Sequence, residues 1–100
     1  MVHKIIWAPR AREDLREIVN YIRHDNPEAA QRFGQKLIAK VESLERFPER
    51  GRIIQKFQNP LIREVFLGPY RIAYRINPEQ LQVEAVRIWH GARSEENFEL

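Results

Sequence analysis

Three segments in the last third of the chain alternate apolar and polar residues, and arginine recurs among the polar ones. The segments span residues 62–66, 70–76 and 83–93. Because successive side chains of a β-strand point to opposite faces, this pattern predicts strands of a small sheet. Arginine suits phosphate and carboxylate groups, so we expect one apolar face and one cationic face that meets an anionic partner. The arginines in these segments are Arg63, Arg71, Arg75, Arg87 and Arg93.

Turn signals separate the three predicted strands. Gly68-Pro69 follows the first strand, and the Asn-Pro-Glu-Gln run at 77–80 follows the second. Connections this short join antiparallel neighbours, which predicts a meander. The last strand carries apolar residues on both faces, which is typical of a central strand. In the middle strand we expect a core face made of Tyr70, Ile72, Tyr74 and Ile76, and an opposite face made of Arg71, Ala73 and Arg75.

The first half of the chain predicts one strand and two helices. Residues 2–7 are apolar and β-branched, which favours a strand. Residues 9–24 carry apolar side chains at helical spacing behind a proline that suits the first helical position. Asn26 and Pro27 then break this helix and begin a second one, which we expect to run to about residue 46 and to end before Phe47-Pro48. Residues 49–60 are expected to form a polar loop.

Together these elements predict an α+β fold in the order β-α-α-β-β-β, with an antiparallel helical hairpin packed on one sheet. The chain of 100 residues is expected to form a single domain over 1–100. It has a net charge of +3, and lysine stands only at 4, 36, 40 and 56, so the basic residues are mostly arginine. The chain has no cysteine and no apolar run long enough to span a membrane, so we expect a cytoplasmic protein.

This order of elements, together with five local sequences, resembles the RelE/ParE superfamily of bacterial toxins. The local sequences lie at residues 26–30, 47–51, 62–64, 68–75 and 86–93. The resemblance implies the toxin of a type II toxin–antitoxin system, a pair often linked to plasmid stabilisation. A cognate antitoxin would wrap the toxin, neutralise it and form a hetero-oligomer with it. ParE-like members inhibit DNA gyrase, whereas RelE-like members cleave mRNA in the ribosome.

The chain ending favours the ParE-like branch, a binding poison that needs no catalysis. Residues 89–93 resemble that branch, and residues 91–100 lack the tyrosine that the ribonucleases of the superfamily commonly carry. The alternative is a metal-independent endoribonuclease. For that activity the residues offer His90 as acid or base, Glu49 as base and Arg63 as a phosphate clamp. A third alternative is a diverged, non-toxic module that only binds an antitoxin.

The binding poison would use an exposed surface, for which we expect the contacts Arg63, Arg71, Arg75, Arg87, Arg93 and Trp89. Arg63, Arg71 and Arg75 would also be explained by ion pairs with Glu64, Glu84 or helix carboxylates. The histidines stand at 3, 24 and 90 without metal-ligand spacing, so we expect neither a metal nor another cofactor.

Overall fold

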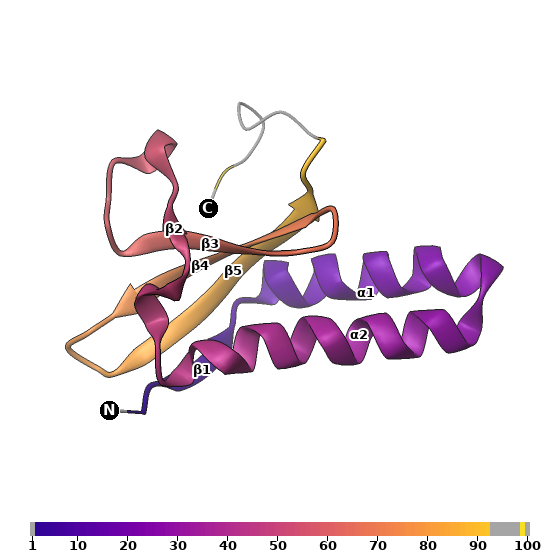
Figure 1. Cartoon of the computed structure of the whole chain (residues 1–100), viewed down its shortest axis with the longest axis horizontal. Helices are drawn as coiled ribbons and strands as arrows, with labels where there is room; N and C mark the ends of the chain where they lie inside the picture. The colour runs from indigo at the N-terminus through magenta and orange to yellow at the C-terminus, as the bar shows by residue number, and fades with distance from the viewer. Residues whose placement is uncertain (1, 93–98, 100) are drawn as a thin grey trace.

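The computed structural model describes residues 2–92 and 99, and it folds them into two layers (Figure 1). A hairpin of α1 (Pro9–Asp25) and α2 (Pro27–Glu42) packs against one face of a five-stranded sheet. The sheet order is β1-β5-β4-β3-β2, with β1 parallel to β5 and every other pair antiparallel. Its strands are β1 (Lys4–Trp7), β2 (Arg52–Ile53), β3 (Ile62–Leu67), β4 (Tyr70–Asn77) and β5 (Gln82–His90).

This architecture confirms the predicted α+β class, the helical hairpin and the meander, and it corrects the loop. Residues 49–60 contain the edge strand β2 and single turns of 3₁₀-helix, so the sheet has five strands where four were expected. The second helix ends at Glu42, and a 3₁₀ turn over Ser43–Glu45 continues it to the expected break. The first strand pairs with β5, which makes β5 central, as its apolar residues on both faces predicted.

The helical hairpin follows from local chemistry at its two starts. Pro9 and Pro27 occupy the first turns of α1 and α2, where a missing N–H costs nothing. The Asn26 side chain accepts a hydrogen bond from the Ala29 N–H at 3.0 Å, which caps α2. Only one residue separates the two helices, so they return antiparallel (Figure 1). Apolar side chains of both helices pack against the sheet.

The main core lies between the hairpin and the sheet. Fully burying a leucine or isoleucine side chain contributes about 1.5–3 kcal/mol, so this layer supplies most of the stability. The predicted core face of β4 is confirmed, because Ile72, Tyr74 and Ile76 are buried here and Tyr70 packs beside them. The other buried members are Ala11, Leu37, Val41, Leu44, Val65, Val83, Ala85 and Ile88.

A β-bulge in β5 explains why that strand carries apolar residues on both faces. Ala73 lies across from Arg87, but Tyr74 lies across from Ala85, so Val86 is an extra residue. Ala85 and Ile88 therefore both face the helices, although simple alternation would separate them. Val86 and Trp89 both face the opposite side, where they form a second, smaller cluster with Ile54, Ile62 and Ala73. We call this second side the open face of the sheet.

Candidate functional site

The predicted cationic residues do not share one face of the sheet. Arg63 lies across from Tyr74, a core residue, so Arg63 is on the helix-facing side. Arg75 lies across from Ile62, and Arg71 lies across from Trp89, which places both on the open face. The expectation of a single cationic face is therefore wrong. Val65 must enter the core, and that requirement fixes the phase of β3 and turns Arg63 toward the helices.

Arg71 is buried in an ion pair on the open face. Its Nε and Nη2 donate to the two carboxylate oxygens of Glu64 at 2.7 and 3.0 Å. Arg52 Nε donates to the same carboxylate at 2.9 Å. Arg71 also stacks 4.6 Å from the ring of Trp89, and the two residues are only 8% and 4% exposed. Neither can form the exposed contact that we expected, and the alternative of pairing with Glu64 is confirmed for Arg71.

Arg63 and Tyr74 instead hold the loop that follows the helices. The Tyr74 hydroxyl donates to the Pro48 carbonyl oxygen at 2.5 Å and accepts from the Gly51 N–H at 2.9 Å. Arg63 donates to the carbonyl oxygens of Gly51 and Pro60 at 3.0 and 2.9 Å and reaches that of Glu49 at 3.4 Å. Burial raises the pKa of the Tyr74 hydroxyl above its ordinary value. The group therefore stays protonated and keeps its donor.

Two further arginines pair with carboxylates. Arg87 Nε donates to Asp14 Oδ2 at 2.9 Å, which joins β5 to α1. Arg75 Nη1 lies 3.5 Å from Glu84 Oε1 on the neighbouring strand, and Arg75 is exposed. The Arg75–Glu84 pair matches the alternative that this arginine binds a carboxylate of the sheet. Arg93, the fifth predicted contact, lies outside the described residues.

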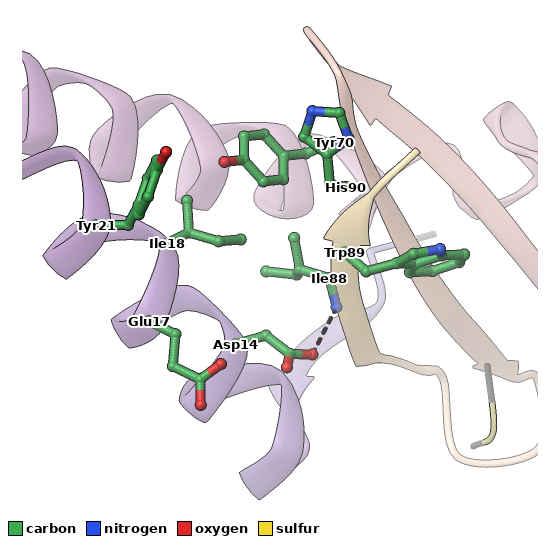
Figure 2. A pocket seen from close by; sticks show the side chains of 8 residues that line it. All are labelled: Asp14, Glu17, Ile18, Tyr21, Tyr70, Ile88, Trp89 and His90. Atoms are coloured by element: carbon green, nitrogen blue, oxygen red, sulfur yellow. Dashed lines mark hydrogen bonds between the residues drawn. The ribbon is translucent and has the colours of Figure 1, made fainter. Parts of the chain in front are cut away.

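His90 lies at the end of β5 beside a cavity of about 350 Å³ between α1 and the sheet (Figure 2). Its imidazole is exposed, and its Nδ1 accepts a hydrogen bond from the Ala92 N–H at 3.1 Å. Tyr70 meets the imidazole edge-on, with ring centroids 5.5 Å apart. The cavity is lined by Asp14, Glu17, Ile18, Tyr21, Tyr70, Ile88, Trp89 and His90.

The three residues predicted for a ribonuclease do not converge. Glu49 and Arg63 lie together at the loop. His90 lies across from Tyr70 on β4, and Tyr70 lies across from Leu67 on β3. Arg63 stands four residues before Leu67 on the same strand. At about 3.3 Å per residue, His90 is roughly 13 Å from Arg63 along the strands, with two further strand spacings between them. A single phosphodiester cannot contact both groups within hydrogen-bond distance.

Sequence reasoning missed the acidic half of this arrangement. Glu64 and Asp14 are buried carboxylates that organise the open face and the α1–β5 junction, respectively. Asp14 stands one turn before Ile18 on the apolar side of α1, and a charge in that position is a signal for a buried ion pair. Among residues 2–92 and 99, no group of three or more histidine, aspartate or glutamate side chains is placed to hold a metal ion. No helix among these residues is long and apolar enough to cross a membrane.

Comparison with known proteins identifies the family. Residues 5–95 match the family model described as the ParE toxin of the type II toxin–antitoxin system parDE. This protein belongs to the ParE toxin family. Two relatives of this ParE-family chain come from Caulobacter vibrioides. Toxin RelE2 is 37% identical over 90 residues, which cover 90% of this chain and 97% of that protein. Toxin RelE1 is 32% identical over 95 residues, which cover 91% and 96%.

Solved structures share the ParE fold. The chromosomal ParDE system of P. aeruginosa superposes with a TM-score of 0.73 at 21% identity, covering 89% of this chain and 96% of that one. The RelBE2 toxin–antitoxin complex of Mycobacterium tuberculosis gives a TM-score of 0.68 at 24% identity, covering 93% and 95%. The predicted membership of the RelE/ParE superfamily of type II toxins is confirmed.

Proposed function

We propose that this ParE-family toxin acts by binding and inhibiting DNA gyrase, and that a cognate antitoxin neutralises it. The observation that carries the proposal is the separation of His90 from Arg63 and Glu49, which leaves no assembled acid–base site among the described residues. Cleavage of RNA needs a base, an acid and cations around one phosphate. A binding poison needs only a complementary surface.

The internal use of the arginines supports the same proposal. The guanidinium of Arg63 is committed to backbone carbonyl oxygens of the loop, and that of Arg71 to Glu64. Neither is oriented to stabilise a developing phosphate charge. Arg52 and Arg75 are exposed on the open face, and the Arg52 guanidinium lies over the ring of the exposed Phe66 at 4.9 Å. Arginine and aromatic residues are both enriched at protein interfaces.

Exposed apolar residues support an antitoxin partner. Tyr21 is 76% exposed and Phe47 is 60% exposed, and they lie on α1 and on the loop after α2. Relatives of this fold were solved as toxin–antitoxin complexes, including RelBE2 and a RelE toxin bound to an antitoxin peptide. A partner segment that covers such residues would stabilise the toxin and block its target surface at once.

A supercoiling assay tests the proposal. Purified toxin added to gyrase and relaxed plasmid should inhibit supercoiling or trap cleaved DNA, and antitoxin added beforehand should abolish the effect. Charge reversal in Arg75→Glu should weaken inhibition, whereas Glu79→Lys, in the turn between β4 and β5, is the matched control and should not. Full supercoiling at saturating toxin would refute the gyrase proposal.

Ribosome-dependent cleavage of mRNA is the second candidate, because the imidazole of His90 is exposed at the mouth of a cavity. That activity predicts codon-positioned cuts in a programmed ribosome complex, lost in His90→Ala. A toxin that leaves both gyrase and mRNA unaffected, and whose expression without antitoxin permits normal growth, would be the non-toxic module.

A further inference from the structure

The segment between α2 and β3 carries the positive charge of the whole chain. Residues 46–63 contain five arginine or lysine residues and one glutamate, a net charge of +4, whereas the 100 residues together have a net charge of +3. The segment forms the outer edge of the sheet through β2, with a turn of 3₁₀-helix on either side of that strand (Figure 1). Its cations are Arg46, Arg50, Arg52, Lys56 and Arg63, and all of them except Arg63 are exposed.

Three of these arginines converge at Gly51. Arg50 and Arg52 flank it in the sequence, and Arg63 Nη1 donates to its carbonyl oxygen at 3.0 Å. Arg52 and Arg63 also line the same hollow of about 470 Å³ at the edge of β2. Like charges this close repel each other, and an anion bound beside them would relieve the repulsion.

Neutral groups hold two of the three arginines. Arg63 donates to backbone carbonyl oxygens, and the Arg50 guanidinium lies 5.6 Å from the centre of the Phe47 ring. No ion pair joins Arg50 or Arg63 to a carboxylate in the part of the chain that the structure describes. A carbonyl group or an aromatic ring attracts a cation without cancelling its charge. Both positive charges therefore remain uncompensated at this edge.

Arg52 is only partly neutralised, because it shares one carboxylate with a second arginine. Glu64, which lines the same hollow, accepts hydrogen bonds from both Arg52 and Arg71, so two cations meet one anion. Arg52 uses its Nε for this bond, and its side chain is 65% exposed. A guanidinium carries further N–H groups on its two terminal nitrogens. Arg52 can therefore donate to an external anion while it keeps its bond to Glu64.

The arrangement suits the phosphates of duplex DNA better than other polyanions. Duplex DNA presents one negative charge per about 1.7 Å of its axis, whereas an extended acidic peptide offers at most one per residue, or about 3.3 Å. Single-stranded nucleic acids bind where bases can stack on aromatic rings. Here the guanidinium groups of Arg50 and Arg52 lie over the exposed rings of Phe47 and Phe66, so charge is presented in place of a stacking surface.

We propose that the sheet edge around Gly51 binds the phosphate backbone of duplex DNA without regard to base sequence. Arg50 and Arg52 contact phosphate oxygens. Arg63 keeps the loop in place through its backbone bonds and adds its charge to the local field. Phosphate contacts fix position and carry no sequence information, so every duplex should bind alike. The inference goes beyond the proposed function, since it requires no gyrase and is tested in its absence.

Fluorescence anisotropy of a short labelled DNA duplex, titrated with the full chain at several salt concentrations, tests the site. We expect a dissociation constant of about 1–100 μM at physiological salt, and an affinity that falls steadily as salt rises. The double variant Arg50→Ala/Arg52→Ala should bind every duplex more weakly. The slope of the logarithm of affinity against the logarithm of salt concentration should become shallower by about 2, one for each lost phosphate contact.

Two further double variants separate position from charge and from folding. Arg23→Ala/Arg32→Ala removes the same total charge from exposed positions on the helical hairpin, and it should keep the wild-type slope. Arg50→Lys/Arg52→Lys keeps both charges and should keep the slope as well, and circular dichroism should show the same fold for all variants.

Four results would overturn the inference. The first is an equal loss of affinity and slope in the two alanine variants. The second is no binding of duplex at about 50 mM salt, where phosphate contacts are strongest. The third is tighter binding of single-stranded DNA or RNA than of duplex. The fourth is displacement of the duplex by polyglutamate at equal charge concentration, which would identify an acidic protein as the partner.

Discussion

Replacing Tyr74 by phenylalanine removes one buried hydroxyl and little else. That hydroxyl donates to the Pro48 carbonyl oxygen and accepts from the Gly51 N–H, so two hydrogen bonds are lost and the two backbone groups lose their shared partner. At about 1 kcal/mol for each bond, we expect the free energy of unfolding to fall by roughly 2 kcal/mol. For a domain of this size, that loss lowers the Tm by about 8–16 °C.

Urea denaturation followed by circular dichroism measures the change. The midpoint should fall while the slope with urea stays constant, since the surface exposed on unfolding is unchanged. The exposed Tyr21 gives the matched control, because Tyr21→Phe should alter stability by less than about 0.5 kcal/mol. A Tyr74→Phe variant as stable as Tyr21→Phe would refute the conclusion that this hydroxyl holds the loop.

Three further perturbations test the same region. Glu64→Ala should lower the free energy of unfolding by about 3 kcal/mol in chemical denaturation, because it leaves the buried Arg71 without its carboxylate. Arg52→Ala should lower it by less than about 1 kcal/mol, because the Arg52 side chain is 65% exposed. Equal losses in the two variants would contradict the buried pair. Gly51→Ala should lower the Tm, since its Cβ would stand 2.5 Å from the Tyr74 hydroxyl oxygen and 2.6 Å from the Glu64 carbonyl oxygen; an unchanged Tm would contradict this contact. Because the pKa of Tyr74 is raised in the folded state, this tyrosine ionises first in the unfolded chain. The free energy of unfolding should therefore be full below pH 10.0 and fall above it. Denaturation measured across that pH range should show a smaller fall for Tyr74→Phe than for wild type.

The sequence predicts most of the fold because its helix-capping and turn residues act locally. Asn26 and Pro27 define the hairpin, and Gly68-Pro69 defines the first turn of the meander, since each acts on its own backbone. The strand β2 escapes prediction, because two residues within a polar loop carry no alternation. The bulge at Val86 also escapes, because an extra residue in β5 has meaning only against the register of β4.

The candidate site is less predictable than the fold because it depends on which side chains meet. Alternation places Arg71 and Arg75 together, but it cannot relate the phase of β3 to that of β4, and Arg63 therefore lies on the other face. The sequence alone also does not predict which of these arginines are buried. Arg71 is buried because Glu64 supplies both carboxylate oxygens to it across the sheet, a partner that only the register brings into reach.

The most direct test of a binding poison is the inhibition of gyrase supercoiling by the His90→Ala toxin, titrated beside wild type. His90 is exposed and its substitution leaves the core intact. If the toxin acts by surface complementarity, both proteins should inhibit supercoiling at concentrations within about twofold of each other, a difference of less than about 0.5 kcal/mol. Supercoiling that proceeds unaffected by wild type, with mRNA cut by wild type and spared by His90→Ala, would contradict the account.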